Sequence, residues 1–205
     1  MAKAELSQNG EARAWQRMLS GRRLDLLNPS PFDIEIEDIA HGLARVARWN
    51  GQTQGEHAYS VAQHSLVVEQ IFRQLYPQSH SRDCLYALLH DAPEYVIGDI
   101  ISPFKAVIGK QYEIIEKRIQ DAIHMRFSLL VDPSQKLLKK IKQADRIAAF
   151  YEAITVAGFH TEEALRYFGF PNNILPDELD LQPYPTQKIE KAFLTRFSIL
   201  DAQRS

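Results

Sequence analysis

The segment from residue 90 to residue 99 holds the densest group of side chains that could do chemistry. Within ten residues it carries one histidine, two aspartates and one glutamate, namely His90, Asp91, Asp99 and Glu94. Imidazole and carboxylate groups bind divalent cations and transfer protons near neutral pH. The apolar run 84–89 ahead of them is typical of a buried helix face, and Pro93 is expected to end or kink that helix. We therefore expect a polar pocket wall at a helix-to-loop junction.

Two further candidate ligands come from distant parts of the chain. His64 lies on the core-facing stripe of a predicted helix over 60–75, and Asp145 lies near the apolar stripe of a predicted helix from 134 to about 157. A buried, unpaired carboxylate costs several kcal/mol, so Asp145 needs a partner. A metal is one such partner, and a cation such as Lys142 or Arg146 is another.

Together these positions make a set of two histidines and two carboxylates. The set is His64, His90, Asp91 and Asp145. Nitrogen and oxygen donors of this kind suit Mn²⁺, Co²⁺, Fe²⁺, Ni²⁺ or Zn²⁺ better than Ca²⁺. No second group of histidines lies near His90, so the sequence favours one ion over two.

Each member of this set also has an ordinary structural interpretation. A His-Asp pair is common at surfaces, a core histidine is usually hydrogen-bonded, and the whole cluster could be a buried polar network without metal. Among the other histidines, His57 is the main rival to His64 as first ligand, and His41 is expected to be structural or to support the ligands. Three more look peripheral: His80, His124 and His160.

The elements that must position these residues are read as helices throughout. Besides the helices named above, we expect helices over 11–20, 35–49, 103–127, 161–168 and 186–200. The start signal of the helix 103–127 is Ser102-Pro103. Turns are expected over 22–34, and an irregular crossing over 171–185. No succession of strands is evident. The sequence predicts an all-α, single-domain helical bundle over 1–205, with a core of about 36–157 on which the helix 186–200 packs.

Composition narrows the classes of function. The chain has 205 residues, 45% of them hydrophobic and 24% charged, with a formal net charge of -2. This balance offers no basic footprint for nucleic acid, so a small molecule is the expected partner. Cys84 is the single cysteine, which fits a reducing compartment, and no apolar run approaches ~20 residues. We therefore expect a cytoplasmic protein that neither crosses a membrane nor is exported.

The order His64, His90-Asp91, Asp145 resembles the H…HD…D signature of the HD-domain metal-dependent phosphohydrolases, an all-helical superfamily. The likeness is greatest to the bacterial 5′-deoxynucleotidases and to a set of phage and bacterial HD hydrolases. It extends over 38–152 and includes the stretches 38–41, 59–65 and 90–94 with Arg48-Trp49-Asn50-Gly51, Gly98-Asp99, Pro103, Lys105 and Ala144-Asp145.

The resemblance implies a role for each matching position. His64, His90, Asp91 and Asp145 would hold one divalent ion, and Glu94 would handle the proton of a water molecule. Arg48 would hold the substrate phosphate, with Lys105 adding positive charge nearby. Trp49 and Asp99 match positions that lie against the sugar in the deoxynucleotidases, which also form dimers, so a homodimer is an option here.

The chain departs from the deoxynucleotidase pattern near the expected sugar site. Gln63 replaces a glutamate, and Pro93 and Ile97 stand where hydroxyl residues are common. The sequence therefore leaves the choice between deoxyribose and ribose open. The preferred hypothesis is a phosphohydrolase acting on a nucleoside 5′-monophosphate. The alternatives are a non-catalytic module that binds metal and nucleotide, and a phosphodiesterase acting on another phosphorylated small molecule.

Overall fold

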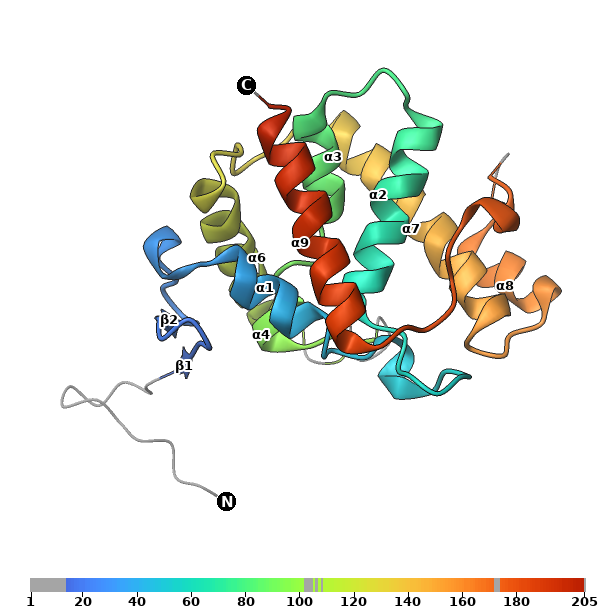
Figure 1. Cartoon of the computed structure of the whole chain (residues 1–205), viewed down its shortest axis with the longest axis horizontal. Helices are drawn as coiled ribbons and strands as arrows, with labels where there is room; N and C mark the ends of the chain where they lie inside the picture. Colours follow the sequence, from blue (N-terminus) through green and yellow to red (C-terminus); the bar gives the residue numbers. More distant parts are fainter. Residues whose placement is uncertain (1–13, 102–104, 106, 108, 172–173, 205) are drawn as a thin grey trace.

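A computed structural model describes residues 14–101, 105, 107, 109–171 and 174–204. Figure 1 shows a bundle of helices with a small β-hairpin beside it. The helices are α1 (Ile36–Leu43), α2 (Val61–Leu75), α3 (Ser81–Leu88), α4 (Glu94–Ile97), α6 (Lys110–Arg126), α7 (Gln135–Thr155), α8 (Thr161–Phe168) and α9 (Thr186–Ala202). The predicted all-α class is confirmed.

Helices α2 and α7 form the centre of the bundle and carry the residues of interest. They pack against each other, and α3 packs against both. Ser60 caps α2 by accepting a hydrogen bond from the amide of Gln63 at 3.3 Å, and Ser134 caps α7 by accepting one from Leu137 at 3.2 Å. The apolar faces of both helices are buried, and this packing fixes the position of α2 relative to α7.

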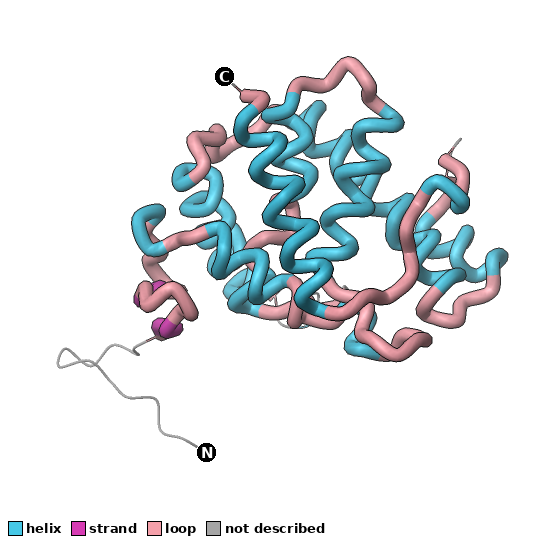
Figure 2. Tube along the Cα trace, viewed as in Figure 1, coloured by secondary structure: helices cyan, strands magenta, loops and turns pink. Residues whose placement is uncertain are grey.

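The last helix, α9, covers the bundle from one side. It contacts α1, α2 and α3, and its inward residues Phe193 and Leu200 are buried. Figure 2 shows that the chain ahead of α9 runs mostly as loop along the side of the bundle. One turn of 3₁₀ helix, Pro176–Glu178, interrupts this loop. The prolines in this segment lack an N–H donor, which disfavours a longer helix.

Helices α1 and α4 approach each other closely at Gly42. A Cβ atom at this position would lie 2.7 Å from the carbonyl oxygen of Tyr95 and 2.8 Å from its Cβ atom. The missing side chain therefore lets α1 support α4, whose first residue is Glu94. This contact therefore helps to position Glu94.

The helix predicted over 11–20 is wrong for its described part. Residues Trp15–Arg17 form strand β1, which pairs antiparallel with β2 (Arg23–Asp25), and residues 11–13 lie outside the described part. The turn predicted over 22–34 is likewise wrong at β2. Gly21 at φ 90° provides the tight turn, and burial of Leu24 anchors the hairpin. The apolar spacing in so short a segment did not distinguish a helix from a strand.

Several predicted helix boundaries also differ from the structure. Helix α1 ends at Leu43 instead of extending to 49, and α3 ends at Leu88, ahead of Pro93. Helix α6 begins at Lys110; the predicted start at Ser102-Pro103 lies outside the described residues. Within the described residues, none of the helices combines the length and apolar character needed to cross a membrane.

Candidate metal centre

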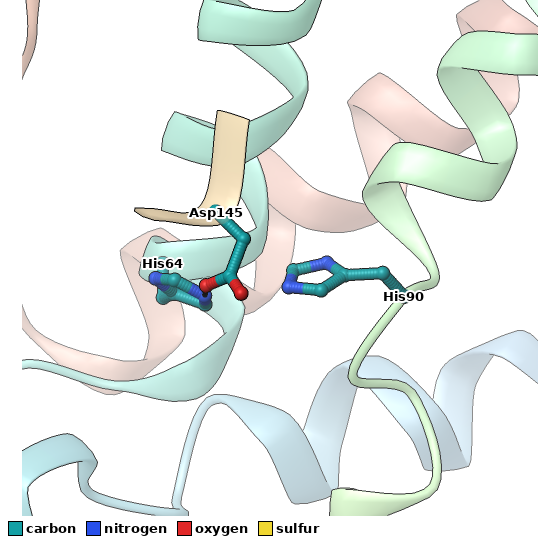
Figure 3. A group of neighbouring side chains, drawn as sticks. All are labelled: His64, His90 and Asp145. Carbon is teal, nitrogen blue, oxygen red and sulfur yellow. Dashed lines mark ion pairs between the residues drawn. The ribbon is translucent and has the colours of Figure 1, made fainter. Parts of the chain in front are cut away.

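The predicted ligands come together from three parts of the chain. His64 lies on α2, Asp145 lies on α7, and His90 lies in the turn that follows α3. One ligand atom from each of these three residues lies within 4.8 Å of the others. Figure 3 shows their side chains pointing toward one another, with the carboxylate of Asp145 between the two imidazole rings.

Asp91 also faces this cluster. Its Oδ2 atom lies 3.2 Å from Nε2 of His90 and 3.5 Å from Nε2 of His64. The Oδ1 atom of Asp145 lies 3.4 Å from the same His64 nitrogen, while its Oδ2 atom pairs with the exposed Lys142 at 2.7 Å. The cationic partner considered for Asp145 from sequence is thus present, but it occupies only one of the two oxygens.

The two histidines present their Nε2 atoms to the cluster. His64 directs Nδ1 to Glu152 at 2.5 Å, and His90 directs Nδ1 to the carbonyl oxygen of Ala87 at 2.8 Å. Both Nε2 atoms are buried and have no hydrogen-bond partner, although carboxylate oxygens lie nearby. Unpaired imidazole nitrogens beside carboxylates form a donor set that fits a divalent transition metal.

The electrostatics of the cluster indicate a site for a cation. Burial opposes the charged forms of His64, Asp91 and Asp145, but their mutual attraction outweighs it. Burial and the charge of Arg48 lower the pKa of His64, but Glu152, followed by Asp145 and Asp91, holds it well above its usual value. The pKa of Asp91 and that of Asp145 are held well below their usual values. Carboxylates kept ionised in a buried position would be neutralised by a bound cation.

Glu94 differs from these carboxylates. It begins α4 and is buried, and its Oε2 atom has no hydrogen-bond partner. Burial, together with the charges of Asp91 and Asp99, raises the pKa of Glu94 to about 9. Lys105 lies 3.5 Å from its Oε1 atom and opposes this shift. A carboxyl group with such a pKa holds its proton near neutral pH, and a nearby cation would favour its ionised form.

The remaining predicted substrate residues line the same region. The guanidinium group of Arg48 donates a hydrogen bond to Asp99 at 3.3 Å and one to Glu152 at 3.5 Å. Its backbone amide donates to the carbonyl oxygen of Tyr59 at 2.8 Å, which ties this segment to the start of α2. Burial opposes the charged form of Arg48, but the nearby carboxylates raise its pKa.

Trp49 stands in a strained backbone conformation. Its φ of 57° and that of 51° at Asn50 lie in the left-handed region, which is uncommon for residues other than glycine. The indole ring packs against Phe159 and Phe168 at centroid distances of 5.5 and 5.8 Å, and its Nε1 atom donates to Glu152 at 3.1 Å. Surrounding contacts therefore hold this side chain in place despite the backbone strain.

Glu152 is the residue that the sequence reasoning did not single out. It is fully buried on α7 and contacts three of the predicted site residues, His64, Arg48 and Trp49. A usable signal was present, because Glu152 follows Asp145 by seven residues. That spacing is two helical turns, so both carboxylates fall on one face.

The other histidines lie elsewhere in the structure. Among the described residues, the group suited to a metal does not include His57. His41 pairs with Glu190 at 3.5 Å, and His124 lies 2.7 Å from the side-chain amide of Gln120. Two more, His80 and His160, precede the first residues of α3 and α8.

The fold is a helical bundle, and imidazole and carboxylate groups converge between its helices. This arrangement is typical of metal-binding helical proteins, and comparison with known proteins identifies the family. The family model described as 5′-deoxynucleotidase YfbR-like matches residues 39–166. The chain belongs to this YfbR-like family. The family is of the HD-domain type, a class of metal-dependent phosphohydrolases.

Three relatives are similar to this chain to different extents. An uncharacterized protein of Rhodobacter capsulatus is 54% identical over 188 residues, which cover 92% of this chain and 96% of the relative. The uncharacterized protein YfdR of Escherichia coli is 36% identical over 47% of this chain and 49% of its own length. The 5′-deoxynucleotidase YfbR of Salmonella typhi is 26% identical over 74% of this chain and 70% of its own length.

Proposed function

We propose that this chain is a metal-dependent phosphohydrolase that removes the phosphate group from a nucleoside 5′-monophosphate. The observation that carries the proposal is the pair of buried Nε2 atoms of His64 and His90, which lack hydrogen-bond partners and face Asp91 and Asp145. These four residues would hold one divalent ion of the Mn²⁺, Co²⁺, Fe²⁺, Ni²⁺ or Zn²⁺ type. When bound, the ion would polarise the phosphoryl group and acidify a water molecule.

Glu94 is the proposed proton carrier. Its carboxyl group borders the cluster, and its raised pKa of about 9 keeps it protonated near neutral pH in the metal-free protein. A bound divalent ion would favour the ionised form and so bring this pKa toward neutrality. Once ionised, the carboxylate would accept a proton from the attacking water and return it to the leaving nucleoside oxygen. Lys105 lies 3.5 Å from the Oε1 atom of Glu94 and would stabilise the ionised carboxylate by an ion pair.

Arg48 is the proposed phosphate-binding residue. Its side chain is held between Asp99 and Glu152, so the guanidinium group is oriented before substrate arrives. Arginine suits a phosphate because its N–H donors match two phosphate oxygens at once. Asp99 and Trp49 are the proposed sugar contacts, with the carboxylate as acceptor for a sugar hydroxyl and the indole as an apolar wall.

The nucleotide substrate rests on family membership and on one named relative. The YfbR protein of Salmonella typhi is named a 5′-deoxynucleotidase, and at 26% identity it supports the reaction class more strongly than the choice of sugar or base. Because Asp99 already pairs with Arg48, the space left for a 2′-hydroxyl depends on this pair. We therefore propose the 5′-monophosphate class and test the two sugars side by side.

The test is phosphate release from matched ribo- and deoxyribonucleoside 5′-monophosphates in the presence of Mn²⁺, Co²⁺ or Zn²⁺. The 3′-monophosphates and a cyclic nucleotide serve as comparison substrates. Asp145→Ala removes one proposed ligand and should abolish both metal retention and turnover. Asp121→Ala is the matched control, because Asp121 is an aspartate on α6 that pairs with Lys117.

Each outcome decides between hypotheses. Release from 5′-monophosphates that requires metal and Asp145 supports the proposal. Tight nucleotide binding without release under any metal would assign the chain to a non-catalytic module. Turnover confined to the cyclic nucleotide would make it a phosphodiesterase, and full activity of the metal-free Asp145→Ala variant would refute the metal site.

A further inference from the structure

Glu152 connects two groups of residues that the proposed function treats separately. It lies on α7 two turns after Asp145, and its side chain has no exposed surface. One carboxylate oxygen, Oε1, faces the proposed ligand His64. The other, Oε2, faces the proposed substrate residues Arg48 and Trp49.

The contact with His64 determines which imidazole nitrogen faces the cluster. Nδ1 of His64 lies 2.5 Å from Oε1 of Glu152, and a carboxylate can only accept in this pair. Nδ1 therefore keeps its proton, so Nε2 is the nitrogen that would bind a metal once the second proton of the charged imidazole has left it. Carboxylates placed in this way behind a histidine ligand fix its ring orientation and increase its basicity.

The contacts on the other oxygen hold the substrate residues. Trp49 donates its indole N–H to Oε2 at 3.1 Å, and Arg48 approaches the same atom at 3.5 Å. Both residues belong to the segment where Trp49 and Asn50 adopt left-handed φ values. A strained segment persists only where contacts over-determine it, and Glu152 provides two of these contacts.

We infer that Glu152 is a positioning residue that couples the metal centre to the substrate-binding segment. This inference rests on the proposed function. Because one rigid carboxylate is shared, the orientation of His64 depends on the same atom group that orients Arg48 and Trp49. Loss of Glu152 should therefore weaken metal binding and substrate binding together, although Glu152 touches neither.

A second buried glutamate offers the matched control for a merely structural role. Glu69 on α2 is 1% exposed and forms ion pairs with Arg73 and Arg196. It resembles Glu152 in burial and in arginine pairing, but its ion pairs do not involve the cluster. Neutralising either glutamate should lower the free energy of unfolding, whereas only Glu152 should affect the site.

The experiment compares Glu152→Gln, Glu152→Asp and Glu69→Gln in a Trp15→Phe background, where Trp49 is the only tryptophan. Three quantities are measured: the Mn²⁺ dissociation constant of the nucleotide-free chain by calorimetry, the emission spectrum of Trp49, and KM and kcat. Thermal unfolding reports whether each variant is folded. Glutamine keeps the size of the side chain, and aspartate keeps the charge but shortens the reach.

We expect Glu152→Gln to weaken Mn²⁺ binding about 10- to 100-fold, as removal of the carboxylate behind a metal-bound histidine does. The same variant should shift the Trp49 emission and raise KM. Glu152→Asp should show the same losses, because one shortened carboxylate cannot reach both sides. Glu69→Gln should leave all three readouts unchanged while its unfolding temperature falls.

Two results would overturn the inference. If Glu152→Gln or Glu152→Asp chains are folded and bind Mn²⁺ as tightly as the parent, Glu152 does not position the metal centre. If the Trp49 emission spectrum and KM are unchanged in these variants, Glu152 does not position the substrate-binding segment. If the parent binds Mn²⁺ but hydrolyses no nucleotide, the proposed function fails, and the Mn²⁺ and Trp49 readouts still decide the role of Glu152.

Discussion

Replacing Glu94 with glutamine should stabilise the metal-free protein while removing its activity. In the folded chain the pKa of Glu94 is raised from 4.5 to about 9, chiefly by burial and then by Asp91 and Asp99. The folded chain therefore keeps a proton that the unfolded chain releases above pH 4.5. The free energy of unfolding contributed by this group falls as the pH rises from 4.5 to 9, and glutamine has no such loss.

The size of the effect follows from the shift. A pH of 7.5 lies three units above the pKa of 4.5 that Glu94 has in the unfolded chain. At about 1.36 kcal/mol for each unit, the loss of unfolding free energy has an upper limit of about 4 kcal/mol. Because water and side chains rearrange around a buried charge, we expect about half, or about 2 kcal/mol. In a protein of this size that gain raises the unfolding temperature by about 4 to 8 °C. At pH 5 the same reasoning gives about 1 °C.

The assay is thermal unfolding of EDTA-treated parent and Glu94→Gln chains at pH 5, 7.5 and 9. Glu116→Gln is the control, because Glu116 also pairs with Lys105, at 3.0 Å, but its side chain is 30% exposed. A gain for Glu94→Gln that is the same at pH 5 and pH 9 would refute the reasoning, since titration would then not be its source. Turnover with metal should fall at least about 100-fold.

Three other predictions concern metal, phosphate and packing. Mn²⁺ at 100 times its dissociation constant should raise the free energy of unfolding by about 2.7 kcal/mol, and Asp145→Ala should abolish this gain in a thermal shift assay. Arg48→Lys should raise KM about tenfold with little change in kcat, because a lysine cannot reach Asp99 and Glu152 together; an unchanged KM would contradict this. Gly42→Ala should lower the free energy of unfolding by about 1 to 3 kcal/mol, since its methyl group would meet the backbone of α4 at 2.7 Å; denaturant unfolding equal to the parent would contradict this.

Local sequence patterns determined most of the helices. Helix α8 has the predicted bounds 161–168, and α2 and α7 each begin one residue after the predicted starts at 60 and 134. These features depend on apolar spacing and capping within one segment, which a sequence displays directly. The residue types of His64, His90, Asp91 and Asp145 and their places on predicted elements also predicted from the sequence that they form a metal-binding set.

The tertiary structure alone decided how those residues meet. The hairpin of β1 and β2 depends on cross-strand hydrogen bonds, and the turn between α3 and α4 depends on packing of α4 against α1 and of α3 against α2, so neither follows from local spacing. The role of Glu152 is the clearest case, because its partners at positions 48, 49 and 64 are remote in sequence. A charged residue in an apolar helix face is costly until the fold brings partners to it, and only the packed structure reveals which partners those are.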